Sequence, residues 1–406
     1  MSRMQPSDAK QTAEAIAWAA AEGASLEVVA GGTKRALGRP LKTDHVLDVS
    51  GLKGIVEYEP AELILTVRPG ETLASIKAEL AKAGQMLSFE PPDWRALIGG
   101  EGEETMGGVI GCNLAGPRRV RAGSARDYLL GFSAVNGFGD IWKAGGKVVK
   151  NVTGYDMCKL QTGAYGTLSA LTELTLKAMP KPEAAATILL HGLADDVAIR
   201  TLAKALNSPF EVSGAAHVPA SIARRSKTGV SAEGSGPVTA LRLEGPRPSV
   251  AYRADALEAL VGRGARLDDA ETEKLWSEVG TVRPMLGPDG RVVWRICPTP
   301  SHAATVAYSI LKARPSAEFY YDWGGGLIWL SLDAAEAGAD AGASVVRQAV
   351  KSAGGHATLI VAPEAVRAAT PVFEPMGAAL AELSARVKKG FDPRGILNPG
   401  RMQEGL

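Results

Sequence analysis

The sequence contains few cysteines, no long apolar run and no excess of charge of either sign. Its three cysteines, Cys112, Cys158 and Cys297, are far apart and no C-x-x-C occurs, which argues against a disulfide framework and against an iron–sulfur or zinc site. No run of 18 or more apolar residues occurs, so no segment is predicted to cross a membrane. With 45 basic and 44 acidic residues, the net charge of +1 gives no field that would hold nucleic acid or an anionic membrane.

Several motifs of common enzyme classes are also missing. No G-x-G-x-x-G opens a helix after a strand, and neither a phosphate-binding G-x-x-x-x-G-K-[ST] nor a G-x-S-x-G elbow is present. The five histidines are scattered without metal-ligand spacing, so no metal site is predicted. The first residues lack the apolar core of a signal peptide. We therefore expect a cytoplasmic protein, with any attachment to the inner membrane made through a partner.

What the sequence does contain is an unusual amount of glycine. Its 406 residues include 47 glycines, in a chain whose 46% hydrophobic content is typical of globular proteins with a core. The length predicts two or three domains. Because the glycines fall in short groups between apolar segments, they predict many tight turns, or backbone brought close to a ligand.

Hydrophobic periodicity predicts an α+β fold in the first half of the chain. The expected elements are a helix over 7–22 capped by Ser7, a helix over 72–83 capped by Thr72, an irregular glycine-dense stretch over 99–125, and strands at 26–30, 44–49, 54–58, 63–67, 128–136, 140–143 and 168–177. The run Met179-Pro180-Lys181-Pro182 is predicted to be a linker, since two prolines so close together interrupt regular structure.

The second half is predicted to hold a ferredoxin-like α+β domain. The expected elements are strands at 186–190, 211–217, 238–243, 292–297, 319–322, 327–332 and 357–361, and helices at 195–206, 249–261, 301–312, 344–353 and 378–388. A Gly/Ser-rich loop is expected at 227–237. We expect one domain over residues 1–180, a second over 181–340 and a C-terminal segment over 341–406.

Three glycine clusters are candidates for a ligand site. In the first, Ala30-Gly31-Gly32-Thr33-Lys34 directly follows a strand, and consecutive glycines let successive N–H groups form an anion-binding concavity. The second runs through Gly107, Gly108 and Asn113 to Gly123, Ser124 and Asp127. The third joins a polar stretch at 150–157 to Gly163, Gly166, Thr167, Leu168 and Glu173. Taken alone, the first cluster is more typical of an ordinary turn than of a ligand site. The second is also compatible with a solvated loop, and the third with a turn and core tyrosines.

Side chains near these clusters leave alternatives open. Two interpretations are open for the arginines at positions 118, 119 and 121. Either they contact a phosphate, a carboxylate or a partner, or they lie in a solvated loop. Tyr155 or Tyr165 would stack on a ligand or belong to the core.

Taken together, the clusters resemble the flavin-binding domain of the vanillyl-alcohol-oxidase-type (PCMH-type) FAD oxidoreductases. The ending 392–400, D-P-x-x-x-L-N-P-G, also resembles that family, whose tail returns to the flavin. The resemblance implies a two-lobed FAD-binding domain, a ferredoxin-like cap and a tail that returns to the FAD domain. It also implies that the first cluster holds the FAD pyrophosphate, the second lies along the ribityl and diphosphate, and the third lies along the adenosine. The FAD-binding residues implied in this way are Ala30, Gly31, Gly32, Thr33, Lys34, Gly107, Gly108, Asn113, Gly123, Ser124, Asp127, Gly163, Gly166, Thr167, Leu168, Glu173 and Asn398.

Within this family, the chain is most similar to the smaller FAD-binding subunits of bacterial glycolate oxidases. The stretches 116–119 and 150–156 and the length of about 400 residues carry that resemblance. It implies a complex with a larger FAD-containing subunit and an iron–sulfur subunit, which oxidises glycolate to glyoxylate and passes electrons towards the respiratory chain. It implies no nucleic acid and no direct membrane insertion.

The chain departs from the family at a motif of its catalytic members. Members that oxidise 2-hydroxy acids carry H-x-G-D-G-N, and the matching region 321–327 keeps a glycine turn but lacks the histidine. No catalytic residue is therefore assigned; Asp322 remains either a base or an ordinary strand-end acid, and Trp323 either a flavin contact or core. Residues 29–34 contain no His or Cys, so FAD is expected to be noncovalent.

The first hypothesis from the sequence is thus an accessory FAD subunit of a glycolate oxidase-type complex. A free-standing FAD-dependent 2-hydroxy-acid (D-lactate-type) dehydrogenase and a flavin-free structural subunit remain the alternatives. The sequence does not select one 2-hydroxy acid as the substrate.

Overall fold

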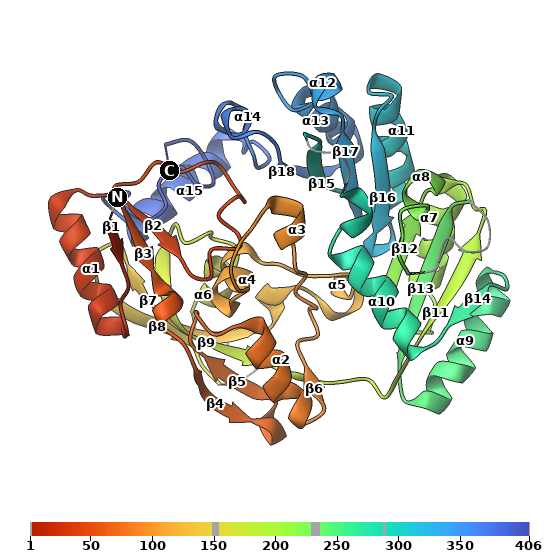
Figure 1. The fold of residues 1–406 in the computed structure, drawn as a ribbon, viewed down its shortest axis with the longest axis horizontal. Helices are drawn as coiled ribbons and strands as arrows, with labels where there is room; N and C mark the ends of the chain where they lie inside the picture. Colours follow the sequence, from red (N-terminus) through yellow and green to blue (C-terminus); the bar gives the residue numbers. More distant parts are fainter. Residues whose placement is uncertain (1, 148–153, 229–235, 287–289, 406) are drawn as a thin grey trace.

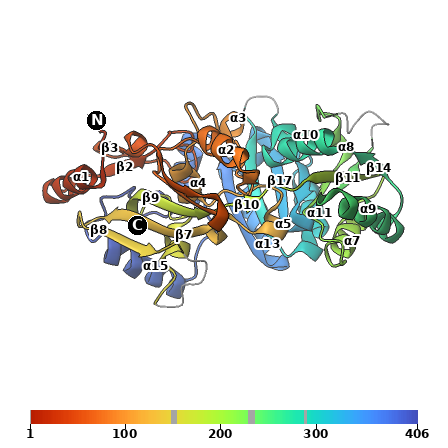
Figure 2. The same cartoon turned by 90° about the horizontal axis from the view of Figure 1, so that it is seen from below.

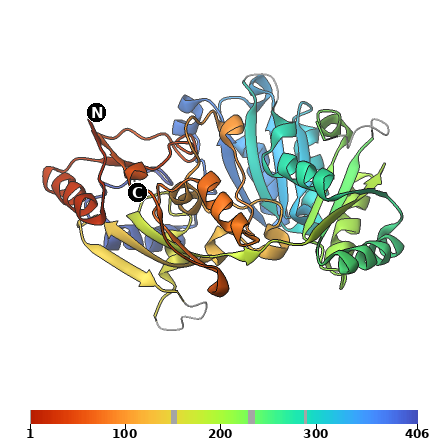
Figure 3. The same ribbon diagram turned by 60° about the horizontal axis from the view of Figure 1, so that its bottom comes forward.

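The chain forms two units that lie side by side (Figures 1 and 3). The computed structural model describes residues 2–147, 154–228, 236–286 and 290–405. The first unit contains the N-terminal part of the chain, and the C-terminal helix α15 (Ala378–Phe391) lies with it (Figure 1). Among these residues, no helix combines the length and the apolar composition needed to cross a bilayer.

The first unit is built on two main sheets. A parallel sheet has the order β1-β3-β2, and an antiparallel sheet has the order β4-β5-β9-β7-β8. This pair of sheets matches the two-lobed domain expected from the sequence. Its elements are β1 (Ser2–Met4), α1 (Ala9–Glu22), β2 (Leu26–Val29), β3 (His45–Asp48), β4 (Ile55–Glu59), β5 (Ile64–Val67), α2 (Leu73–Lys82), β6 (Gln85–Met86), α3 (Arg95–Ile98), α4 (Met106–Cys112), α5 (Arg119–Ala122), β7 (Leu129–Asn136), β8 (Ile141–Gly145), α6 (Met157–Gln161), β9 (Ser169–Lys177) and β10 (Met179–Pro180).

Local capping explains where these helices begin. Thr72 caps α2 as predicted, because its hydroxyl accepts a hydrogen bond from the Ser75 N–H. The prediction of Ser7 as the cap of α1 is wrong: the cap is Asp8, whose carboxylate accepts from the Gln11 N–H.

Two predictions about irregular segments also need correction. The stretch 99–125 is not irregular throughout, since Thr105 caps the short helix α4 through the Gly108 N–H. The expected linker at 179–182 includes β10, which pairs with β6. Proline is tolerated there because this two-stranded sheet leaves the other edge of β10 unpaired.

The second unit is one eight-stranded sheet in the order β14-β11-β13-β12-β16-β17-β15-β18, with the strand pairs antiparallel. Its elements are β11 (Ala184–His191), α7 (Asp195–Leu206), β12 (Gly214–Val218), α8 (Ala220–Ala223), β13 (Val238–Gly245), α9 (Arg247–Val261), β14 (Ala265–Leu267), α10 (Asp269–Gly280), β15 (Val292–Pro298), α11 (Ala303–Ala313), β16 (Glu318–Asp322), β17 (Leu327–Leu332), α12 (Ala334–Ala337), α13 (Ala343–Ala353) and β18 (Gly355–Val361).

This sheet consists of two ferredoxin-like halves. Each half follows the order β-α-β-β-α-β, and in each the first strand lies between the third and the fourth. The halves meet where His217 of β12 pairs with Tyr321 of β16. The expected ferredoxin-like cap is therefore a duplicated version of that unit. The predicted loop at 227–237 falls largely on 229–235, which lie outside the described residues.

The expected boundary at residue 340 is wrong. β18 pairs with β15 along the edge of the cap sheet, so 341–361 belongs to the second unit. The sequence pattern showed the strand but not its partner, and strand pairing decides domain membership.

The tail after β18 returns to the first unit. It contains α14 (Glu364–Ala369) and α15, and Figure 2 shows α15 beside β7 and β8. The Leu26 N–H donates to the Ile396 carbonyl at 2.7 Å, and the Asn398 N–H donates to the Leu26 carbonyl at 2.9 Å. The buried ammonium of Lys388 holds this turn by donating to Asp392, to the Leu397 carbonyl and to the Thr167 carbonyl.

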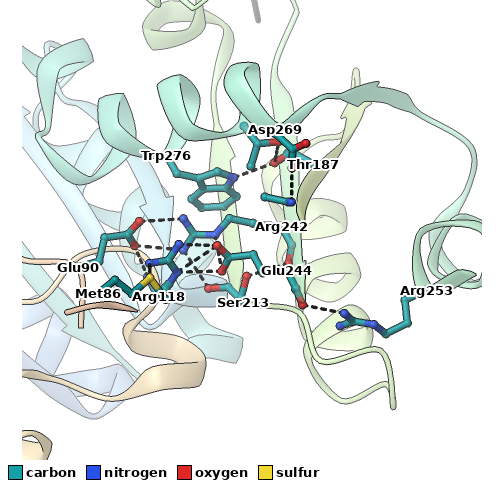
Figure 4. Close-up of polar contacts among 12 residues, drawn as sticks. Met86, Glu90, Arg118, Thr187, Ser213, Arg242, Glu244, Arg253, Asp269 and Trp276 are labelled. Atoms are coloured by element: carbon teal, nitrogen blue, oxygen red, sulfur yellow. Dashed lines mark hydrogen bonds and ion pairs between the residues drawn. The ribbon is translucent and has the colours of Figure 1, made fainter. Parts of the chain in front are cut away.

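The two units share a buried interface. The indole N–H of Trp94, in the first unit, donates to the Gly280 carbonyl at 3.1 Å, and its ring meets the Trp329 ring edge-on at 5.2 Å. Two ion pairs also join the units, one with its arginine in the first unit and one with its arginine in the second (Figure 4). Arg118 of the first unit pairs with Glu244 of the second, and Arg242 of the second pairs with Glu90 of the first.

Candidate functional site

The three glycine clusters and the tail converge on one pocket in the first unit. It has a volume of about 790 Å³, including the part open to solvent. The predicted residues that line it are Ala30, Gly31, Gly32, Thr33, Lys34, Gly107, Gly108, Gly166 and Asn398. Segments that are up to 370 residues apart in the chain thus face one cavity.

The turn after β2 presents free backbone donors to this pocket. In the described part of the chain, the N–H groups of Gly32, Thr33 and Lys34 have no hydrogen-bond acceptor, whereas the Gly31 N–H donates to the Thr105 hydroxyl at 3.3 Å. Gly32 has φ +77° and no atom lies within 4 Å of the place a Cβ would occupy. Successive N–H groups without acceptors are the donor set that binds an anion such as a pyrophosphate. The residues present therefore fit the diphosphate of FAD.

A loop that precedes α4 lies against this turn. A Cβ on Gly31 would stand 1.9 Å from the Glu103 carbonyl oxygen, so only glycine permits this approach. A Cβ on Gly100 would stand 2.4 Å from the Thr33 carbonyl oxygen. The loop and the turn thus lie in close backbone contact beside the pocket.

Asn398 joins the tail to the first and third clusters. Its carboxamide oxygen accepts from the Val28 N–H at 2.7 Å, and its NH₂ group donates to the Tyr165 carbonyl at 2.6 Å. A Cβ on Gly166 would stand 2.7 Å from the same NH₂ group. The LNPG ending therefore closes one side of the pocket.

The charges that line the pocket are largely compensated. Lys34 donates to Glu104 at 2.9 Å and to the Thr33 hydroxyl at 3.0 Å. The guanidinium of Arg401 donates to the Arg35 carbonyl at 2.8 Å and lies 4.0 Å from Glu27. Burial lowers the pKa of Arg401, and the nearby acids only partly offset this effect.

Several pocket residues were not predicted from the sequence, and Thr105 and Arg401 are two of them. Thr105 both caps α4 and contacts the Gly31 turn, and Arg401 follows the LNPG motif directly. Thr105 could have been found from its N-cap position before a glycine pair. Arg401 could not, because its place depends on the returning tail.

The remaining predicted residues do not line the pocket. Ser124 and Asp127 form a reciprocal capping box, in which the Ser124 N–H donates to the Asp127 carboxylate at 2.7 Å. Asn113 ends α4 and accepts from the Arg126 N–H. Gly123 of the second cluster is also outside the lining, and so are four residues of the third cluster: Gly163, Thr167, Leu168 and Glu173.

The tyrosines of the third cluster differ in burial. Tyr155 is 89% exposed, and Tyr165 lines the pocket, with its ring 5.1 Å from that of Phe373. Residues 150–153 of the predicted polar stretch lie outside the described residues.

The region that replaces H-x-G-D-G-N lies between the two units. Asp322 is buried and accepts from the Trp323 N–H at 2.7 Å. Burial raises the pKa of Asp322 to about 7, although the Trp323 hydrogen bond and the charge of Arg242 lower it. The Trp323 indole N–H donates to the Gly116 carbonyl at 3.1 Å. Trp323 therefore contacts the first unit, and its side chain also packs against a hydrophobic cluster that spans both units.

Comparisons with known proteins agree with this geometry. A family model described as "FAD binding domain" matches residues 3–145. The chain is 33% identical to glycolate oxidase subunit GlcE of Escherichia coli, over 97% of each chain. It is 38% identical to glycolate oxidase subunit GlcD of Bacillus subtilis over 151 residues, which are 37% of this chain and 30% of that one.

Solved structures show the same fold at low sequence identity. p-Cresol methylhydroxylase matches with a TM-score of 0.71 and 13% identity, covering 100% of this chain and 89% of that one. 4-Ethylphenol oxidase from Gulosibacter chungangensis matches with a TM-score of 0.72 and 13% identity, covering 99% and 88%. The full-length similarity, the FAD-binding domain and the shared fold together show that this chain belongs to the PCMH-type, FAD-linked oxidoreductase family that includes glycolate oxidase subunit GlcE.

Proposed function

We propose that this chain is the accessory FAD-binding subunit of a glycolate oxidase-type complex. One observation carries the proposal: the glycine clusters and the returning tail assemble a pocket with three consecutive N–H groups that have no acceptor among the described residues. The chain is similar to subunit GlcE over 97% of its length. FAD, when bound, supplies the two-electron redox chemistry, and the protein supplies position and electrostatics.

The pocket residues have distinct roles in this proposal. The N–H groups of Gly32, Thr33 and Lys34 bind the diphosphate, whose charge they neutralise at close range. Gly107 and Gly108 keep side-chain bulk away from the second wall of the pocket. Asn398 holds the third cluster against β2 and so sets the width of the pocket.

The FAD is held noncovalently. Cys112 lines the pocket, but burial raises the pKa of its thiol to about 11, against smaller opposing effects of Lys34 and Arg401. The thiolate, not the thiol, is the nucleophile, so Cys112 is poorly suited to attach a flavin.

The larger flavin subunit carries out the oxidation of the hydroxy acid in this proposal, and an iron–sulfur partner receives the electrons. The turn at Asp322 and Trp323 supports this division, because the buried carboxyl is engaged by a backbone N–H and the family histidine is absent. General acid–base catalysis needs a group within hydrogen-bond reach of the substrate.

FAD binding is tested by Gly32→Glu, which places a carboxylate beside the free N–H groups. Gly23→Glu is the matched control, because Gly23 also has a positive φ and open space beside it but lies at the end of α1, away from the pocket. We expect G32E to bind FAD at least about tenfold more weakly, while G23E binds as the wild type does. Titration followed by flavin fluorescence measures both. Equal affinities would contradict the assignment of the turn.

The place in a complex is tested by co-expression with a larger flavoprotein subunit and an iron–sulfur subunit. We expect the three chains to co-purify and the assembly, but not this chain alone, to reduce a dye with glycolate. Turnover of glycolate or D-lactate by the isolated chain would instead favour a free-standing dehydrogenase. Full activity of an assembly that carries G32E and no FAD in this chain would favour a structural subunit.

A further inference from the structure

A cationic cluster lies at the interface of the two units, outside the glycine-lined pocket. Strand register places Cys297 of β15 directly opposite His356 of β18. Arg295 lies two residues before Cys297, and side chains two residues apart share one face of a strand. The partly exposed positions of Arg295 and Cys297 alternate with buried Trp294 and Ile296, which belong to the core on the opposite face.

The first unit contributes to the same cluster. The guanidinium of Arg119, on α5, lies 4.8 Å from the centre of the Trp323 ring, and that of Arg295 lies 5.0 Å from it. Both arginines thus stack on one indole ring, although they come from different units. We call Arg119, Arg295, Cys297, Trp323 and His356 the interface cluster.

Among the residues that the structure describes, no carboxylate pairs with the positive charge of the interface cluster. Within the described ranges, neither Arg119 nor Arg295 forms a side-chain hydrogen bond or an ion pair with an acid. Burial lowers the pKa of Arg119, and the charge of Arg295 lowers it further. The two carboxylates whose charges act on the cluster already accept hydrogen bonds from other groups. Asp127 accepts from the Ser124 N–H, and Glu374 accepts from the Ala357 N–H at 3.0 Å.

The three thiols of the chain differ sharply in their surroundings. Burial raises the pKa of Cys297, but Arg295, the hydrogen bond and charge of His356, and Arg119 together outweigh it and lower the pKa below its ordinary value. Burial dominates at the other two thiols and raises the pKa of Cys112 and of Cys158 to about 11. Cys112 is half-buried like Cys297, so access alone does not separate them.

We propose that Cys297 is a reactive thiolate that hydrogen peroxide oxidises to a sulfenic acid. The sulfur attacks one peroxide oxygen, an S–O bond forms as the O–O bond breaks, and hydroxide leaves. The sulfur loses two electrons and the peroxide gains them. Low thiol pKa, partial exposure and neighbouring cations are the features of redox-sensitive cysteines. This inference does not depend on FAD binding or on the substrate of the complex.

Alkylation by iodoacetamide, followed site by site with mass spectrometry, measures the thiolate. We expect Cys297 to react at pH 7.5 at least about tenfold faster than Cys112 or Cys158 in the folded chain. Arg119→Gln should move the pH profile of Cys297 to higher pH. The matched control is Arg121→Gln, on the same helix, because Arg121 is exposed and pairs with Glu211 instead. Equal rates at the three thiols, or equal profiles for R119Q and R121Q, would overturn the proposal.

Oxidation is tested on the same chain with hydrogen peroxide and the sulfenic-acid trap dimedone. We expect one adduct, on Cys297, that is lost in C297S and reduced in His356→Asn. An adduct on Cys112 or Cys158 with none on Cys297 would refute the inference, and so would a fast alkylation of Cys297 that is not accompanied by a dimedone adduct.

Discussion

The ion pairs at the interface make a quantitative prediction for Glu244. Its carboxylate accepts from Arg118 Nε at 2.9 Å and Nη2 at 2.5 Å, and lies 3.5 Å from Arg242 Nε, with only 9% of the side chain exposed (Figure 4). Burial raises the pKa of this carboxyl, but the Arg118 hydrogen bond and the charges of Arg242 and Arg118 outweigh burial and lower the pKa from 4.5 to about 2.

This shift sets the size of the effect. The pKa falls from 4.5 in the unfolded chain to about 2 in the folded chain. At about 1.36 kcal/mol for a tenfold change in proton affinity, the charged carboxylate contributes about 3 kcal/mol to the free energy of unfolding. Because the folded pKa is lowered, the contribution is full above about pH 4.5 and is lost as the pH falls towards about 2. Glu244→Gln should therefore lower the free energy of unfolding by about 3 kcal/mol at pH 7, since it leaves the Arg118 charge buried without its partner.

Urea denaturation followed by tryptophan fluorescence measures this loss at several pH values. The gap between E244Q and the wild type should narrow as the pH falls from 4.5 to 2. Glu14→Gln is the control, because Glu14 forms an exposed ion pair with Lys10 whose loss should cost less than about 1 kcal/mol. A loss below about 1 kcal/mol for E244Q at pH 7, or a gap that does not narrow in acid, would refute the reasoning. In a double-mutant cycle with Arg118→Met, purely additive losses would do so too.

Two further predictions concern buried charges elsewhere. The pKa of Asp322 is raised from 3.8 to about 7, so the stability due to its protonated form is full below about pH 4 and is lost as the pH rises to about 7. The free energy of unfolding of Asp322→Asn should therefore rise relative to that of the wild type as the pH increases across this range, by up to about 4 kcal/mol in urea denaturation. A difference between the two proteins that stays constant from pH 4 to 8 would contradict this. Lys388→Met should cost about 3–5 kcal/mol, because Asp392 and two carbonyl groups lose their shared donor. It should also weaken FAD binding in a fluorescence titration, because the turn at Thr167 and the tail come apart; unchanged stability would show that Lys388 does not hold the tail.

The interface predictions depend on pairs that no sequence pattern reveals. Arg118 and Glu244 are 126 residues apart, and their pairing follows from how the cap sheet lies against the first unit. The sequence suggested a phosphate, a carboxylate or a partner for Arg118, and the structure gives it an acid of the same chain. Arg119, next to it, instead stacks on Trp323.

Helix α10 begins at a capping signal that the sequence itself contains. Asp268 and Glu271 form a capping box, and Leu275, Trp276 and Val279 are buried on the following turns. The D-x-x-E pattern before an apolar stripe predicts such a helix start. A local rule would thus have found α10, whereas its contact with β11, through the Trp276 indole and the Thr187 hydroxyl, is a tertiary feature.

The sequence by itself determined the α+β class, most element positions and the glycine positions of the pocket, because these depend on local periodicity, caps and backbone freedom. It also carried the family resemblance, since that rests on the order of short motifs. Tertiary structure decided what depends on distant pairing: the duplication in the cap sheet, the membership of β18, the closure of the pocket by Asn398, and the cations around Cys297. Strand partners, desolvation and unpaired charge arise only when segments far apart in the chain share one buried space.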